Sequence, residues 1–175
     1  MVFNITECVD FHHGKRIVIT ILVCGHDVVI IMHKEGDALL IHQPVYYPFR
    51  EVIEDNGRIF VNNQLHYEDG KYTIDFEDFE KKIVDNNVKV FILCNPHNPV
   101  GRVWTKEELE KMGDICLKHN VVIMDDEIHC DFTYPGFKFT SFMTLDEKYH
   151  NSLVLYTSPS KTFNVAGLQP ANIII

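Results

Sequence analysis

The sequence lacks several features that would assign it to a common functional class. It contains no Cys-x-x-Cys and no His-x-x-x-His pair, so a zinc site has little support and we expect no metal. No Gly-x-Gly-x-x-Gly fingerprint follows an apolar run, which argues against a nicotinamide-dinucleotide domain. There is no block of Lys and Arg, and the formal net charge is −9, so nucleic acid and anionic membranes are not expected as general partners.

Signals for export and membrane insertion are also weak. The apolar stretch at 17–32 is interrupted by Cys24-Gly-His-Asp27 and is shorter than the roughly 20 residues of a membrane helix. Residues 1–10 are acidic rather than basic, which does not suit a signal peptide. The five cysteines are widely spaced and odd in number, which is typical of reduced thiols. We therefore expect a cytoplasmic protein with no membrane partner, and one or two buried strands within 17–32.

From Lys34 onward the sequence contains a regular alternation of apolar runs and amphipathic segments. With 175 residues, of which 46% are hydrophobic and 23% charged, the chain can form one domain with a sizeable core. Near-continuous apolar runs on either side of a helix indicate a βαβ unit with parallel strands. Thr105 and Glu108 have the spacing of a capping box at the start of that helix. The expected strands are 38–42, 58–63, 88–94, 121–124 and 153–157, and the expected helices are 44–53, 75–83 and one that begins at Thr105.

Distinctive polar motifs follow three of these strands. They are Asn95-Pro-His-Asn-Pro-Val-Gly101, Asp125-Asp-Glu-Ile-His129 and Ser158-Pro-Ser-Lys161. In open parallel sheets, ligands bind beyond the carboxyl ends of the strands. An amide, a carboxylate and an amine from neighbouring strand ends could therefore converge on one small molecule.

Each motif taken alone has a simpler interpretation. The prolines could shape a strand-to-helix turn, the acidic run could be a solvated strand end, and Lys161 could be a solvated loop lysine. The shared position at strand ends favours a functional site instead. We expect Lys161 to lose hydration there, because desolvation lowers the pKa of an amine and makes it nucleophilic.

Taken together, the motifs make the chain resemble the fold-type I enzymes that use pyridoxal 5′-phosphate (PLP), within aminotransferase class I/II. Pro44-Val-Tyr-Tyr-Pro-Phe49 and the stretch 94–105 are most similar to the MalY/PatB branch, whose members are cystathionine β-lyases, also called cysteine-S-conjugate β-lyases. The resemblance runs from about Lys34 to Ile175. It implies a three-layer α/β fold with a mostly parallel sheet, PLP as the cofactor, a small amino-acid substrate and a homodimer.

The resemblance assigns roles to matching positions. Lys161 would form the Schiff base with PLP and then remove the Cα proton of the substrate. Asp126 would pair with the protonated pyridine nitrogen, which keeps the ring able to accept electrons. Asn98 would donate a hydrogen bond to the phenolate oxygen of the ring, and His129 would lie near the same oxygen.

Two further positions complete the implied site, and together they imply an activity. Tyr46 would stack on the ring face, and Ser158 would contact the phosphate. The implied reaction is α,β-elimination on a sulfur-containing amino acid such as cystathionine, which releases a thiol, pyruvate and ammonia. A PLP-dependent aminotransferase would use the same residues and remains an alternative. An inactive remnant or a non-catalytic binding protein is an alternative of another class.

The sequence also departs from the family pattern. Residues 1–33 stay unassigned, because 19–33 is β-branched and hydrophobic where the family has a glycine-bearing loop and a phosphate-holding helix N-terminus. The family also has a C-terminal small domain whose arginine binds the substrate carboxylate. The stretch 34–175 contains no counterpart of that domain. We therefore expect 34–175 to be the central part of an incomplete large domain. We also expect the chain alone to bind PLP weakly and to turn over substrate negligibly.

Overall fold

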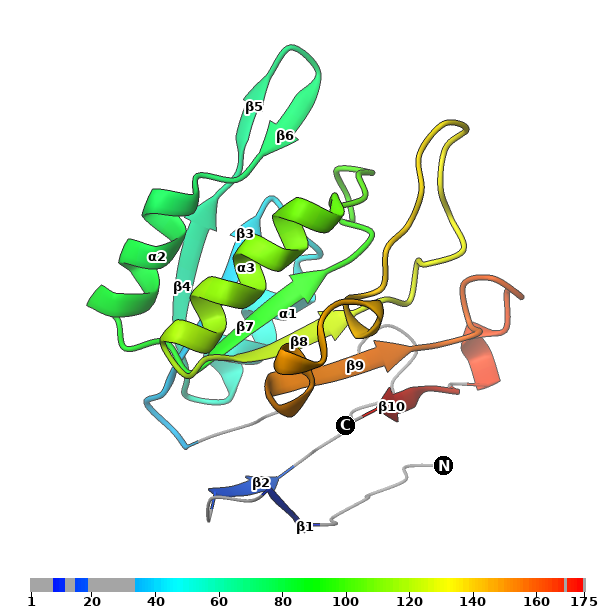
Figure 1. The fold of residues 1–175 in the computed structure, drawn as a ribbon. Helices are drawn as coiled ribbons and strands as arrows, with labels where there is room; N and C mark the ends of the chain where they lie inside the picture. The colour runs from blue at the N-terminus through cyan, green and yellow to red at the C-terminus, as the bar shows by residue number, and fades with distance from the viewer. Residues whose placement is uncertain (1–7, 12–14, 19–33, 169, 175) are drawn as a thin grey trace.

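The computed structural model describes residues 8–11, 15–18, 34–168 and 170–174 (Figure 1). Strands β1 (Cys8–Phe11) and β2 (Lys15–Val18) pair antiparallel as a separate two-stranded sheet. The strands expected within 17–32 fall almost entirely outside the described residues. None of the helices in the described ranges is long and apolar enough to cross a membrane.

A mostly parallel sheet forms the centre of the described part of the chain. Its strand order is β10-β9-β8-β7-β3-β4, in which all pairs are parallel except that of the edge strand β10. This arrangement confirms the expected α/β fold and the expected βαβ unit. The strands are β3 (Ala38–Gln43), β4 (Ile59–Gln64), β7 (Val90–Cys94), β8 (Val122–Asp126), β9 (Leu153–Thr157) and β10 (Asn172–Ile174).

Helices cover both faces of this sheet and give three layers (Figure 1). Helices α2 (Phe76–Asp85) and α3 (Lys106–Lys118) lie on one face, and α1 (Pro48–Asp55) lies on the other. Short 3-10 helices span Phe142–Thr144, Glu147–Ser152 and Ala166–Leu168. A hairpin of β5 (His66–Glu68) and β6 (Lys71–Thr73) projects from the end of the sheet.

Strand β7 explains why the sheet needs cover on both faces. All five of its residues are buried. Because successive strand side chains point to opposite faces, Phe91 and Leu93 join the core under α2 and α3, whereas Ile92 and Cys94 join the core under α1. The apolar run therefore has the pattern of a central parallel strand.

Local sequence signals determine where α3 and α1 begin. The Thr105 Oγ1 accepts a hydrogen bond from the Glu108 N–H (3.2 Å), and the Glu108 Oε2 accepts one from the Thr105 N–H (2.9 Å). The predicted capping box is confirmed, and such a cap contributes about 1 kcal/mol to helix stability. The prediction that a helix begins at Pro44 was wrong, because α1 begins at Pro48. Pro48 provides the fixed φ angle and the missing N–H that suit a first helical turn.

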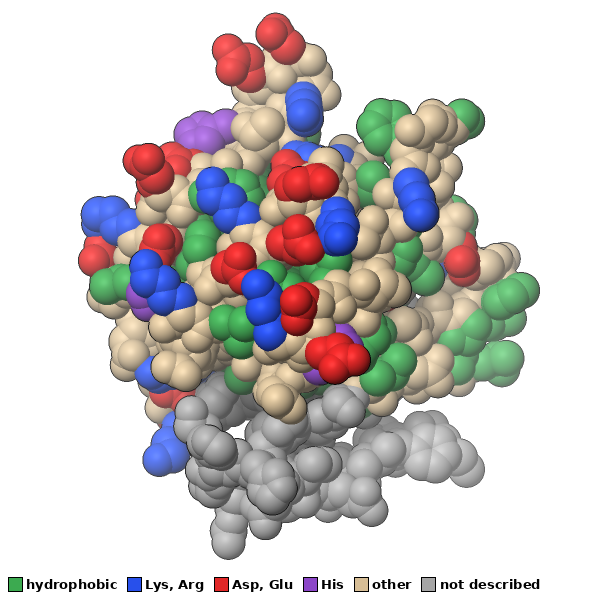
Figure 2. Space-filling view, viewed as in Figure 1, with side chains coloured by type: hydrophobic (Ala, Val, Ile, Leu, Met, Phe, Trp, Pro, Cys, Tyr) green, Lys and Arg blue, Asp and Glu red, His purple; other side chains and the backbone are tan. Residues whose placement is uncertain are grey.

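Charged side chains are mixed over the face formed by α2 and α3 (Figure 2). Lys118 Nζ lies 2.7 Å from Glu80 Oε1, and Lys148 Nζ lies 2.7 Å from Asp114 Oδ1. Exposed pairs of this kind contribute little to stability. They do keep acidic and basic groups interspersed, so that neither sign dominates this face.

Candidate functional site

The carboxyl ends of β7, β8 and β9 lie side by side at one edge of the sheet. Cys94 is in register with Asp126, and Asp126 is in register with Tyr156. Backbone pairing continues past the strands, because the Asn95 N–H donates to the Asp126 carbonyl oxygen (3.0 Å) and the Glu127 N–H donates to the Tyr156 carbonyl oxygen (2.9 Å). The three polar motifs therefore start at the same level, as the strand pattern predicted.

The loop after β7 is fixed by His97. Its imidazole is buried between the carbonyl oxygens of Cys94 (3.2 Å from Nδ1) and Pro44 (3.0 Å from Nε2). Burial lowers the pKa of His97 to about 4, so the ring is neutral at pH 7 and its single N–H donates to one of these two oxygens while the ring packs against the other. The Trp104 indole N–H also donates to the Cys94 carbonyl oxygen (3.0 Å). His97 thus ties the Asn98 loop to the segment that carries Tyr46, a role that the sequence analysis missed.

Tyr46 and Asp126 belong to the same face of the sheet. Tyr46 is partly buried against the α1-side core, which includes Met124 and Tyr156. Its ring also meets the Phe49 ring edge-on, with centroids 5.8 Å apart. Asp126 follows Met124 by two residues and so points to that face as well. This arrangement places an aromatic ring and a carboxylate on one side of the strand ends.

Asp126 is a perturbed carboxyl at the end of β8. Its Oδ1 accepts a hydrogen bond from the Ile128 N–H (3.1 Å). Burial raises the pKa of Asp126 to about 6, while the Ile128 N–H and the charge of Lys161 act in the opposite direction. Burial also lowers the pKa of His129, with a smaller contribution from Lys161. Both groups thus lie at the end of β8, next to the strand that leads to Lys161.

Lys161 lies on a tight turn after β9 and is exposed. The Phe163 N–H donates to the Pro159 carbonyl oxygen (3.0 Å), and the Val165 N–H donates to that of Ser160 (3.0 Å). The expectation that Lys161 loses hydration is not met, because the described elements around this turn leave its side chain in solvent. The residue is nevertheless presented on an ordered loop.

The Ser158 hydroxyl organises the same turn. Its oxygen accepts a hydrogen bond from the Ser160 N–H (3.1 Å) and lies 2.6 Å from the Pro170 carbonyl oxygen, to which the hydroxyl donates. A hydroxyl has one hydrogen to donate. Ser158 would therefore have to release Pro170 before it could donate to a phosphate.

Asp125 and Glu127 face the opposite side of the sheet from Asp126. Both are buried, and the Phe142 N–H donates to the Glu127 Oε1 (3.0 Å). The pKa of Asp125 is raised well above its usual range by burial and then by Glu127, and burial also raises the pKa of Glu127. The acidic run therefore contributes one carboxylate to the candidate site and two to the core beneath it.

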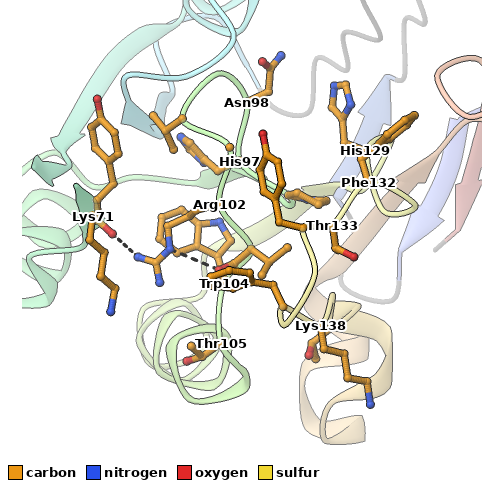
Figure 3. Close-up of a pocket in the computed structure, with 18 of the residues that line it drawn as sticks. Lys71, His97, Asn98, Arg102, Trp104, Thr105, His129, Phe132, Thr133 and Lys138 are labelled. Carbon is orange, nitrogen blue, oxygen red and sulfur yellow. Dashed lines mark hydrogen bonds between the residues drawn. The ribbon is translucent and has the colours of Figure 1, made fainter. Parts of the chain in front are cut away.

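A large cavity adjoins the site without containing it (Figure 3). It measures about 1050 Å³ and lies among the loop after β7, the 129–140 loop and the β5–β6 hairpin. Asn98 and His129 contribute to its lining, whereas Asp126 and Lys161 do not. In Figure 3, Asn98 and His129 lie away from Arg102 and Trp104. The cavity therefore borders the candidate site.

Arg102, one of the cations that line that cavity, is already engaged by protein groups. The Arg102 guanidinium forms an ion pair with Glu108 (Nη2 to Oε1 2.8 Å), donates to the Tyr72 carbonyl oxygen and stacks on the Trp104 ring at 4.4 Å. Its charge therefore supports the fold rather than a ligand. Among the described residues, no group of three or more His, Cys, Asp or Glu side chains is placed to hold a metal ion.

Comparisons with known proteins agree with this geometry. Residues 23–175 match the family model for aminotransferase class I and II, a range that starts ahead of the predicted boundary at Lys34. Cystathionine β-lyase PatB of Bacillus subtilis is 49% identical over 140 residues, which cover 80% of this chain and 36% of PatB. A probable kynurenine–oxoglutarate transaminase of Saccharomyces cerevisiae is 35% identical over 141 residues, which cover 75% of this chain and 31% of that protein.

A solved structure matches as well. The crystal structure of cystalysin from Treponema denticola, which contains a PLP cofactor, superposes with a TM-score of 0.79 and 47% identity, over 81% of this chain and 36% of that one. The chain thus spans about a third of the length of these relatives. Because the family model covers most of the chain, the chain belongs to the aminotransferase class I and II family.

Proposed function

We propose that this chain carries the PLP-binding core of a carbon–sulfur β-lyase that acts on cystathionine or cysteine S-conjugates. The observation that carries the proposal is that the carboxyl ends of β7, β8 and β9, which lead to Asn98, Asp126 and Lys161, lie side by side in the sheet. The similarity to PatB and cystalysin favours the lyase reaction. A homodimer in the cytoplasm is part of the same proposal.

The residues at the strand ends fit PLP chemically. The pyridine nitrogen of PLP needs a carboxylate partner. One Asp126 oxygen accepts a hydrogen bond from the Ile128 N–H, and no hydrogen bond joins the other oxygen to a described residue. The Asn98 amide can donate to a phenolate oxygen, and Tyr46 offers an aromatic ring on the Asp126 face. The buried Tyr156 hydroxyl, in register with Asp126, has no hydrogen-bond partner among the described residues. Such a group suits a site that gains a polar ligand.

PLP, when bound, withdraws electrons from the Cα of an amino-acid substrate. In the proposed reaction, the Lys161 amine would hold the cofactor and would then take the proton from Cα. Asp126 would accept a hydrogen bond from the pyridine N–H, which would keep that nitrogen protonated. His129 is neutral at pH 7 because its pKa is lowered, so its imidazole can share a hydrogen bond without adding positive charge. The sulfur substituent would leave Cβ and take up the proton held by Lys161, which gives a thiol, and hydrolysis of the remaining unsaturated amino acid by one water would give pyruvate and ammonia.

Transamination is the second candidate function. It begins with the same deprotonation and uses the same residues, and the yeast transaminase relative supports it. A non-catalytic binding protein is a candidate of another class.

A product assay separates these candidates. We expect pyruvate release from cystathionine to exceed amino transfer to an added keto acid when both products are measured on one PLP-loaded preparation. Dominant amino transfer would replace the lyase proposal with the aminotransferase. Neither product, together with no PLP attached to Lys161, would favour the binding protein.

A further inference from the structure

A side-chain hydrogen bond links the lysine loop to the loop that follows β8. The Thr162 hydroxyl donates to the Asp131 carboxylate, with 2.6 Å between Oγ1 and Oδ2. This distance is typical of a strong, charge-assisted O–H···O⁻ bond. Thr162 directly follows Lys161, and Asp131 comes two residues after His129. The bond therefore joins the two segments whose polar groups form the proposed site.

Thr162 and Asp131 each lie in a turn that has backbone hydrogen bonds of its own. After β8, the Cys130 N–H donates to the Glu127 carbonyl oxygen (3.0 Å), and the Phe132 N–H donates to that of His129 (2.9 Å). Glu127 is itself buried and bonded to the Phe142 N–H. The turn that carries Lys161 has backbone bonds of the same kind, as described above. A hydrogen bond between two turns that are each bonded internally fixes the position of one turn relative to the other.

We propose that Asp131 is a positioning residue for Lys161, acting through Thr162. The bond holds the lysine turn against the loop that follows β8, and so it limits how far the exposed Lys161 side chain can move from the strand end that leads to Asp126 and His129. The inference rests on the proposed function, because it concerns the attachment of PLP at Lys161. It assigns a role to a carboxylate outside the set of residues expected to touch the cofactor.

The exposure of this bond makes its role testable. Asp131 is exposed, and an exposed hydrogen bond contributes little to global stability. Substitutions here are therefore expected to leave the melting temperature of the chain almost unchanged. A change in the reactivity of Lys161 would then report position and not unfolding.

The experiment compares Lys161 with other lysines of the same chain. The wild type is incubated with PLP, reduced with borohydride at timed intervals, digested, and analysed by mass spectrometry for adducts at Lys161 and at the exposed Lys106 and Lys138. We expect preferential labelling of Lys161 in the wild type. Asp131→Ala and Thr162→Val remove the bond, and each should reduce the labelling rate at Lys161 roughly tenfold, with no change at the two reference lysines.

Conservative variants provide the matched controls. Asp131→Asn keeps an acceptor oxygen and Thr162→Ser keeps the hydroxyl, so both should retain most of the wild-type preference. The double variant Asp131→Ala, Thr162→Val should lose no more than either single variant, because the two side chains act through one bond. Unchanged preference in Asp131→Ala and Thr162→Val would overturn the inference. Absence of any preference for Lys161 in the wild type would instead overturn the proposed cofactor site.

Discussion

Replacing Asp126 by asparagine is expected to weaken PLP binding roughly ten- to hundred-fold, because a charge-assisted hydrogen bond is worth about 1.5–3 kcal/mol. The carboxylate would otherwise face the protonated pyridine nitrogen, and an amide cannot neutralise that charge. Turnover should fall further than binding, since the ring nitrogen then loses its proton more readily and accepts electrons poorly. Covalent attachment at Lys161 should persist at high PLP concentration.

The fluorescence of the single tryptophan, Trp104, measures this affinity during a PLP titration, because Trp104 is buried in the loop after β7. Asp125→Asn is the matched control, since Asp125 is the adjacent carboxyl on the opposite face of the same strand. The control should bind PLP as the wild type does. Equal affinities for the wild type and Asp126→Asn would contradict the assignment of Asp126.

The buried pair Asp125 and Glu127 is expected to make the protein less stable as the pH rises. The pKa of Asp125 is raised in the folded state, by burial first and by Glu127 second. An aspartate in the unfolded chain has a pKa of about 3.9. Above that value the folded state binds more protons than the unfolded state. The free energy of unfolding therefore falls as the pH rises toward the folded pKa, by about 1.4 kcal/mol for each unit of displacement.

Asp125→Asn should remove most of this decline, because an amide needs no added proton beside Glu127 and can donate to it. Urea denaturation of the wild type and the variant at pH 5 and pH 8 measures the effect. We expect the variant to be the more stable of the two at pH 8. The exposed Asp131→Asn serves as the control and should keep the wild-type pH dependence. A decline of the same size in Asp125→Asn would show that the raised pKa of Asp125 does not cause the loss of stability.

The sheet could be predicted from the sequence because its strands are apolar on both faces. The run ending at Cys94 is buried over its whole length from Val90, and the capping residues of α3 stand at the expected spacing. The start of α1 could not be predicted with the same success, because both Pro44 and Pro48 suit a first helical turn and only the tertiary structure selects between them.

The sequence predicted that three strand ends with polar motifs lie side by side, but it did not predict the contacts that support them. The strand pattern predicted an amide, a carboxylate and an amine at one edge of the sheet, and the family resemblance then selected Asn98, Asp126 and Lys161. The two-residue period of β8 could have separated Asp126 from Asp125, which lies on the other face. The bond from Thr162 to Asp131 could not be found in this way, because it joins two loops that are far apart in the sequence.

The exposure of Lys161 shows a further limit of sequence reasoning. The apolar run of β9 suggested a buried position for the residues that follow it, but the turn after Thr157 carries the lysine outward. Hydration of a loop residue depends on which segments cover it, and that information is not contained in its neighbours along the chain.

The most direct test of the central claim is a crystal structure of the chain after incubation with PLP and reduction with borohydride, which fixes the adduct in place. We predict a covalent bond between PLP and Lys161 Nζ, with the pyridine nitrogen within hydrogen-bond distance of Asp126 and the ring against Tyr46. A cofactor attached to another lysine, or seated in the cavity beside Arg102, would contradict the claim that the three strand ends form one PLP site.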